Sequence, residues 1–145
     1  MEKRKVLVTA TNYTAICKRG KKILEENGFE IVENTHGRPF TFEELKELVG
    51  DISAVVAGVD TWNENIFKLA PKLKVISRFG VGVDNIDVLK AKEFGIKVTN
   101  CKGINSNAVS EHAMALMLSS VRMILRLSQT MKEGTWERAV YHEFN

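Results

Sequence analysis

The chain lacks the marks of several large classes of protein. Its 145 residues include only two cysteines, Cys17 and Cys101, whose separation matches no metal or redox motif, so we expect buried free thiols in a reducing cytoplasm. The longest unbroken apolar run, residues 113–118, is too short to span a bilayer, and the apolar run behind the basic start ends by Thr9, too early for a signal peptide. A formal net charge of only +3, from mixed basic and acidic residues, argues against nucleic acid as a partner.

What remains is the composition of a globular protein, 44% apolar and 27% charged. Short apolar runs, several of them rich in valine and isoleucine without clean alternation, are separated mostly by segments of helical periodicity; the runs are residues 6–10, 29–32, 54–57, 75–77 and 96–99. Such runs are typical of strands buried on both faces of a parallel sheet. We therefore predict an α/β fold, a flavodoxin-like doubly wound sheet of five parallel strands in the order 2-1-3-4-5.

A long segment without proline or glycine, residues 106–133, follows the fifth predicted strand and precedes Gly134. As one helix it would be about 40 Å long, more than a compact domain of this size requires. Its middle, A-M-A-L-M-L, is apolar on more than one side, so we expect a surface outside the five-stranded unit to cover it. The prediction is a substrate-binding domain over residues 1–104 and a helix and arm over residues 105–145, with a homodimer formed through the 106–133 helix. A core helix with a frayed polar end is the alternative.

Residues 75–85 read V-I-S-R-F-G-V-G-V-D-N and are the most informative part of the chain. An apolar strand runs into Arg78 and then into Gly80 and Gly82. Glycines at a strand end allow a sharp turn and a close approach of a ligand to the backbone. Free backbone N–H groups beside a guanidinium attract anions. The pattern indicates a site for a small carboxylate or phosphate, although a tight turn with a surface arginine explains it equally well.

Several linked motifs within residues 73–138 extend this pattern: L-K-V-I-S-R-F-G-V-G-V-D-N-I-D, F-G-I-K-V-T-N-C, N-S-N-A-V-S-E-H-A-M-A-L-M-L and K-E-G-T-W-E-R. In this order and spacing they resemble the D-isomer-specific 2-hydroxyacid dehydrogenases, most closely the phosphoglycerate dehydrogenase branch. The resemblance covers the whole chain. It implies an NAD-dependent oxidoreductase that converts a small 2-hydroxy acid into the 2-oxo acid, with a Rossmann domain following the substrate domain.

The dinucleotide fingerprint G-x-G-x-x-G is missing, because Asn85 stands where the third glycine would follow Gly80 and Gly82, and because the motif follows the fourth strand. The chain stops at Asn145, about where the resemblance places the first Rossmann strand. We therefore expect a truncated, substrate-binding part of such an enzyme. It would carry no catalytic residue and no metal site, bind no NAD tightly and be inactive alone.

The resemblance also implies roles for individual residues. Gly80, Val81 and Gly82 would present N–H groups to the substrate carboxylate, Arg78 would contact the substrate, Asn85 would shape the loop, and Val81 and Val109 would approach the nicotinamide of the cofactor. Some relatives carry an arginine where this chain has Ala57-Gly58, which weighs against a phosphorylated substrate, although 3-phosphoglycerate remains our expectation.

Two other functions stay open. Residues 9–14 loosely match the T-x-T-x-x-T phosphate loop of flavodoxins, which would make the protein an FMN-dependent electron carrier with Trp62 stacked on the flavin. That loop lacks the usual glycine, and Thr11 or Thr14 capping the first helix is a simpler explanation. A receiver domain is excluded because no acidic pair follows the first strand. The second alternative is a non-catalytic dimeric scaffold derived from the dehydrogenase fold.

Overall fold

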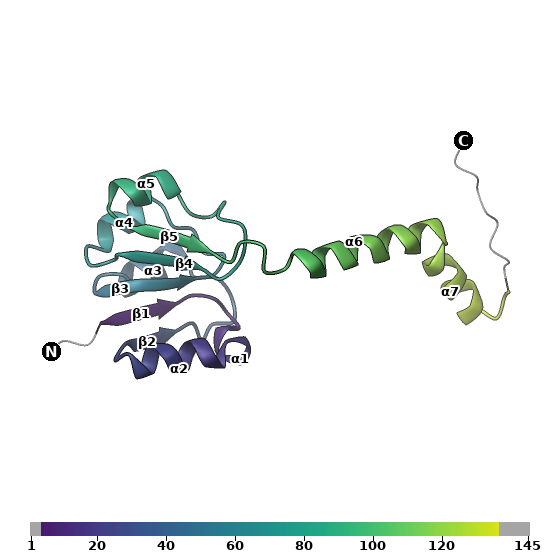
Figure 1. Cartoon of the computed structure of the whole chain (residues 1–145), viewed down its shortest axis with the longest axis horizontal. Coiled ribbons are helices and arrows are strands. Elements are labelled where there is room, and N and C mark those ends of the chain that lie inside the picture. The colour runs from purple at the N-terminus through teal and green to yellow at the C-terminus, as the bar shows by residue number, and fades with distance from the viewer. Residues whose placement is uncertain (1–3, 137–145) are drawn as a thin grey trace. The chain divides into compact units, whose positions relative to one another are not determined.

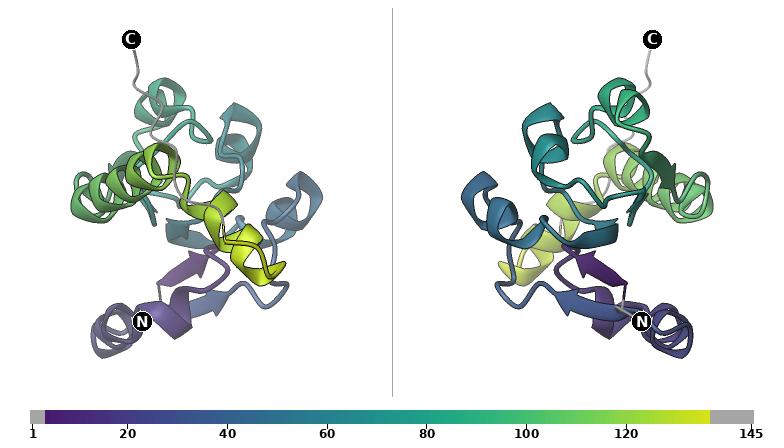
Figure 2. Two further views of the ribbon diagram at one scale, coloured as in Figure 1. Left: turned by 90° about the vertical axis from the view of Figure 1, so that its right-hand side faces the viewer. Right: turned by 90° about the vertical axis from the view of Figure 1, so that its left-hand side faces the viewer.

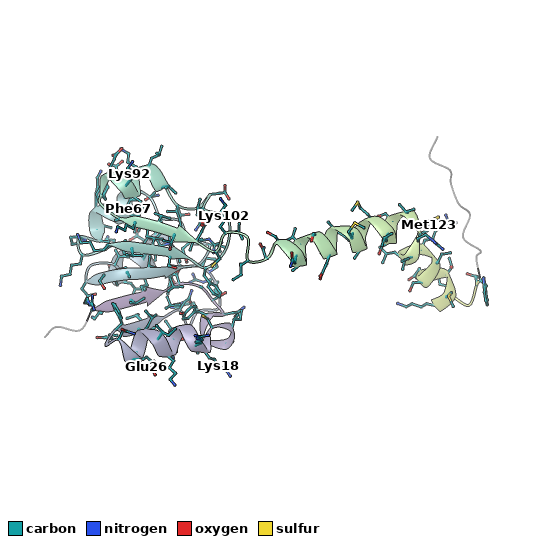
Figure 3. The ribbon with its side chains drawn as sticks, in the orientation of Figure 1. Lys18, Glu26, Phe67, Lys92, Lys102 and Met123 are labelled. Atoms are coloured by element: carbon teal, nitrogen blue, oxygen red, sulfur yellow. The ribbon has the colours of Figure 1, made fainter. Side chains whose placement is uncertain are left out.

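The computed structural model describes residues 4–136 and divides into two compact units, with the boundary after Lys102 (Figures 1 and 3). The first unit contains a sheet of five parallel strands in the order β2-β1-β3-β4-β5, which confirms the predicted fold class and strand order. The strands are β1 (Lys5–Val8), β2 (Glu30–Glu33), β3 (Ile52–Ala57), β4 (Val75–Arg78) and β5 (Lys97–Asn100). All five lie within or beside the predicted apolar runs.

The helices of the first unit lie on both faces of the sheet (Figure 2). They are α1 (Tyr13–Ile16), α2 (Lys18–Glu26), α3 (Phe42–Leu48), α4 (Glu64–Leu69) and α5 (Val88–Glu93). The starts of α3, α4 and α5 follow from the sequence, because Thr41 forms a capping box with Glu44 at α3, Asn63 caps α4 and Asp87 caps α5, whereas α1 and α2 begin without a side-chain cap. These caps determine where α3, α4 and α5 begin.

Two apolar layers hold the unit together. The larger one joins Leu7, Val55 and Ile76 of the sheet to the buried side chains of α3, α4 and α5. The smaller one joins Val6 and Val8 to α1 and α2. Burying apolar area of this kind is the main favourable term in folding such a domain.

Burial on both faces is correct for β1, only partial for β2 and β3, where Ile31, Val32, Ala54 and Val56 are half-buried, and wrong for β4 and β5. In β4 only Ile76 is fully buried, and in β5 no residue is. The helices on the second face, α1 and α2, pack against β1, β2 and β3 (Figure 2). Polar residues, Ser77 and Thr99 among them, occupy the exposed face of the two remaining strands, so the face tolerates water.

The second unit corrects the prediction of one long helix over residues 106–133. It contains α6 (Ser106–Val121) and α7 (Ile124–Lys132), bent by 61° at the break between them. Met123, labelled at the corner in Figure 3, has a left-handed conformation with φ 52° and ψ 33°. Its amide donates to the carbonyl of Ser120 at 3.1 Å, which closes α6 as a glycine C-cap would. The helix therefore breaks without proline or glycine, the two residues that usually indicate a helix break in a sequence.

No side chain of α6 is buried within the chain. The apolar residues of its C-terminal half are all more than half exposed: Met114, Leu116, Met117, Leu118 and Val121. Within residues 4–136, no single helix combines the length and apolar character needed to cross a membrane. Only the bent pair α6 and α7, taken together, meets those two criteria.

Candidate functional site

The loops that follow β3 and β4 meet at the carboxyl edge of the sheet. Trp62 and Ile86 form a short parallel bridge between these loops. The amide of Trp62 donates to the carbonyl of Asn85, and the amide of Asp87 donates to the carbonyl of Trp62, both at 2.8 Å. The loop after β4 is therefore held from its far end by the loop after β3.

Within residues 79–82 every carbonyl group faces the protein. The four carbonyl acceptors and their donors are Phe79 with Arg78 Nη1 at 2.6 Å, Gly80 with the Cys101 amide at 2.9 Å, Val81 with Asn100 Nδ2 at 2.6 Å, and Gly82 with Arg78 Nε at 3.1 Å. In contrast, the amides of Val81 and Gly82 have no acceptor among the residues that the structure describes. A loop with its carbonyls turned inward and two amides unused is an arrangement suited to an anion.

Two residues of the expected site are placed differently from the expectation. The amide of Gly80 donates to the carbonyl of Arg78 at 2.9 Å, so only Val81 and Gly82 offer unused N–H groups. The Arg78 guanidinium binds carbonyl groups of its own loop and, at 3.4 Å, the carbonyl of Ala57. Contact of Arg78 and Gly80 with substrate stays a prediction. These hydrogen bonds already occupy the Gly80 amide and several donors of the Arg78 guanidinium.

An acidic side chain lies beside the loop. A Cβ atom added to Gly82 would come within 3.0 Å of Asp84 Oδ2. Because a carboxylate repels an anion at short range, Asp84 opposes anion binding at the neighbouring amides. The site should accordingly have a low affinity for carboxylates in this chain.

Asn85 joins the two loops through its side chain. Its Nδ2 atom donates to the carbonyl of Gly58 at 3.2 Å and to that of Asp60 at 2.6 Å. Asp60 is buried, and its Oδ1 accepts from the Phe40 amide at 2.6 Å while Oδ2 has no partner among the described residues. The loops after β2, β3 and β4 are therefore tied together at Asp60. The sequence reasoning missed this residue, whose only signal is an acid directly after the apolar run A-V-V-A-G-V.

A cavity of about 230 Å³ lies at the same edge, where β1 and β3 are neighbours and the chain changes direction across the sheet. Residues 9–12, Gly58, Val59, Arg78 and Phe79 contribute to its walls. A Cβ atom at Gly58 would lie 3.1 Å from the Thr9 carbonyl oxygen, so the glycine lets the two loops approach each other closely. Such a position in a doubly wound sheet is where ligands commonly bind.

The loop after β1 does not form a flavin phosphate site. The Thr14 hydroxyl donates to Glu33, and Lys21 lies 2.6 Å from the same carboxylate. The bonds from Lys21 and then Thr14 lower the pKa of Glu33, so the Thr14 hydroxyl is held by an ionised carboxylate and is not free for a phosphate. Trp62 is fully buried and cannot stack on a flavin. Helix α1 begins after Asn12, without a side-chain cap, so capping by Thr11 or Thr14 is also wrong.

Val109 lies in α6 of the second unit, where its side chain is 58% exposed, and its approach to a nicotinamide stays a prediction. His112 is exposed on the same helix. Within residues 4–136, no group of three or more histidine, cysteine, aspartate or glutamate side chains could hold a metal ion.

Known proteins are similar to this chain in sequence and in fold. The chain is 35% identical over 137 residues to a glyoxylate reductase of Pyrococcus furiosus, covering 94% of this chain and 39% of the relative. It is 44% identical over 118 residues to a D-3-phosphoglycerate dehydrogenase of Methanocaldococcus jannaschii, covering 81% and 22%. Among solved structures, the NAD⁺-bound 3-phosphoglycerate dehydrogenase of Entamoeba histolytica superposes with a TM-score of 0.72 at 27% identity, covering 96% and 43%.

The chain thus spans less than half the length of these relatives. Residues 6–141 match the family described as "D-isomer specific 2-hydroxyacid dehydrogenase, catalytic domain". This match extends over nearly the whole sequence, as the linked motifs imply. The chain belongs to the D-isomer-specific 2-hydroxyacid dehydrogenase family.

Proposed function

We propose that this chain is the substrate-binding part of an NAD-dependent D-2-hydroxyacid dehydrogenase resembling 3-phosphoglycerate dehydrogenase. It would hold the carboxylate of a small 2-hydroxy or 2-oxo acid on the amides of Val81 and Gly82. The observation that carries the proposal is the inward turn of every carbonyl in residues 79–82, which leaves these two amides unused. Hydrogen bonds from N–H groups to an ionised acceptor are stronger than those between neutral partners, which suits carboxylate capture.

The described residues do not fit NAD by themselves. The first βα loop has no glycine, and its Thr14 hydroxyl is bound to Glu33 and so is not free to hold a pyrophosphate. NAD would accept the hydride from the substrate in the complete enzyme, and the part of the family's length that this chain does not span would bind it. Val81 and Val109 would then lie near the nicotinamide. The 145-residue chain alone should be inactive.

We propose a homodimer formed through residues 106–133 as well. The argument is the apolar surface of α6, because several leucine and methionine side chains left in water cost about 1.5–3 kcal/mol each. The non-catalytic dimeric scaffold shares this fold and this dimer. Such a scaffold would not bind a carboxylate at the amides of Val81 and Gly82, so a binding experiment distinguishes it from the proposed function.

Titration of the isotope-labelled chain with lactate and with 3-phosphoglycerate, followed by amide NMR, tests the site. We expect weak binding with the largest shifts at Val81 and Gly82. Asp84→Asn should raise the affinity by removing a repulsive charge, whereas Asp51→Asn, at the opposite edge of the sheet, should not. Shifts confined to other parts of the chain would contradict the site, and formation of NADH by the pure chain would contradict the assignment as an inactive part.

A further inference from the structure

We propose that Asn100, the last residue of β5, is a positioning residue for the amide of Gly82. Its carboxamide holds the Val81 carbonyl and thereby sets the direction in which the Gly82 N–H group points. This inference rests on the proposed function, because it explains how that amide comes to face a carboxylate. Asn100 acts on the bound carboxylate through the loop.

The peptide group between Val81 and Gly82 connects the bond that Asn100 makes to the amide of the site. Asn100 Nδ2 donates to the Val81 carbonyl at 2.6 Å. The carboxamide must present its nitrogen here, because its oxygen would place two acceptors face to face. In a planar trans peptide, the carbonyl of one residue and the N–H of the next point in opposite directions. The Gly82 N–H therefore points away from the end of β5.

The preceding peptide group has the same direction but a different donor. The Gly80 carbonyl accepts from the backbone amide of Cys101 at 2.9 Å, so the Val81 N–H also points away from the end of β5. Successive peptide groups of a regular strand point to opposite edges, so two that point the same way need separate donors. The backbone of Cys101 supplies one donor and the side chain of Asn100 supplies the other. Consecutive N–H groups turned to one side form a concavity suited to an anion.

The position of Asn100 in the sheet suits it to this role. Asn100 pairs with Arg78 in the register of β4 and β5, and both strands end at this pair (Figure 1). The loop that leaves β4 therefore starts beside the end of β5. The Asn100 side chain is exposed and adds nothing to the apolar core, so its loss should alter the loop and leave the fold intact.

The experiment begins with ligand-free chains, because a direct contact with substrate has no effect before substrate is present. In Asn100→Ala, the NMR signals of the Val81 carbonyl carbon and of the Gly82 amide should move. The Val81 amide should stay near its place, because the Cys101 backbone still holds its peptide group. The affinity for lactate should fall about tenfold, as expected for the loss of one hydrogen bond to a charged group, with no change in the midpoint of thermal unfolding.

Asn27→Ala is the matched control. It removes a bond of the same kind, from Asn27 Nδ2 to the Ile23 carbonyl at 2.8 Å, at the end of α2. This variant should leave both the loop signals and the lactate affinity unchanged.

A second variant, Asn100→Asp, keeps the test decisive if Asn100→Ala unfolds. The introduced side chain has nearly the same shape but no donor when ionised, so the Gly82 amide signal should be displaced at about pH 7. A protonated carboxyl has one O–H donor, so the difference from the unaltered chain should shrink as the pH falls below about 4. Asp84, whose carboxylate lies beside Gly82, is present in both chains and is therefore matched in the comparison.

The outcomes separate this inference from the proposed function. Displacement of the Gly82 amide that spares the Val81 amide, together with weaker binding, supports the positioning role. Unchanged ligand-free signals with lost affinity would overturn it and show a direct contact of Asn100 with the carboxylate. Equal displacement throughout residues 79–82, or a displacement in Asn100→Asp that low pH does not reverse, would also overturn it. If the unaltered chain binds no carboxylate, the proposed function fails, yet the ligand-free signals still decide whether Asn100 positions the Gly82 amide.

Discussion

One half-buried side chain, that of Glu44, binds several groups of the connection that precedes α3. Arg38 donates to its two oxygens at 2.6 and 2.9 Å, and the Thr41 amide donates to one of them at 2.8 Å. The connection that leads into α3 and includes Pro39, in the wall of the cavity, is therefore fastened to the helix it precedes. The bond from Arg38 and then that from the Thr41 amide lower the pKa of Glu44 from 4.5 to about 2.

This shift predicts a dependence of stability on pH. Because the pKa of Glu44 is lowered in the folded state, its contribution is present above pH 4.5 and is lost as the pH falls towards about 2. The difference in free energy of unfolding between the unaltered chain and Glu44→Gln should thus be larger at about pH 6 than at about pH 3, as measured by urea denaturation. Glu47→Gln, on the exposed side of the same helix, should show no such loss, and an equal loss there would refute the assignment.

At the scale of elements, the junction between α6 and α7 contains a backbone conformation that costs free energy. A left-handed conformation at a residue other than glycine costs about 1–2 kcal/mol. Met123 adopts it nonetheless, with the amides of Arg122 and Met123 bonded back to Leu118 and Ser120. Since no side chain of α6 or α7 is buried within the chain, local capping determines where α6 ends.

Met123→Gly should therefore be at least as stable as the unaltered chain, because glycine adopts positive φ without steric strain. If residues 106–133 formed one continuous helix, the same substitution would instead lower the free energy of unfolding by about 1 kcal/mol. Thermal unfolding followed by circular dichroism at the helical band distinguishes the two. Ala115→Gly, within α6, is the control that should lose about 1 kcal/mol in either case.

For the whole molecule, the largest unexplained feature is apolar surface. The homodimer proposed above predicts a particle of about twice the 16.3 kDa chain mass in sedimentation at micromolar concentration. Leu116→Glu and Met117→Glu should each shift the mass towards the monomer, because a charge would be buried in the interface. Leu89→Glu, on the exposed face of α5, is the matched control and should leave the mass unchanged. A soluble monomer for the unaltered chain would exclude this dimer. The arm beyond residue 136, which the prediction included with the helix, lies outside the described residues.

The parts of the fold that could be predicted depend on local pattern. Short valine- and isoleucine-rich runs, capping residues such as Thr41 and Asp87, and the glycines of residues 79–82 each act through their near neighbours, so the sequence alone determined the parallel sheet, its strand order and the family. The motifs also located the loop where a carboxylate is proposed to bind.

Only the tertiary structure decided how the groups of that loop are used. The bond from the Phe40 amide to the buried Asp60, the links from Asn85 to the loop after β3 and the bond from Arg78 to the Ala57 carbonyl all join residues distant in sequence, for which no local pattern exists. The exposed face of β4 and β5 depends on where α1 and α2 pack, and the bend at Met123 is marked in the sequence by neither glycine nor proline. A sequence records which residues are apolar or charged, whereas their partners are set by the folded arrangement in space.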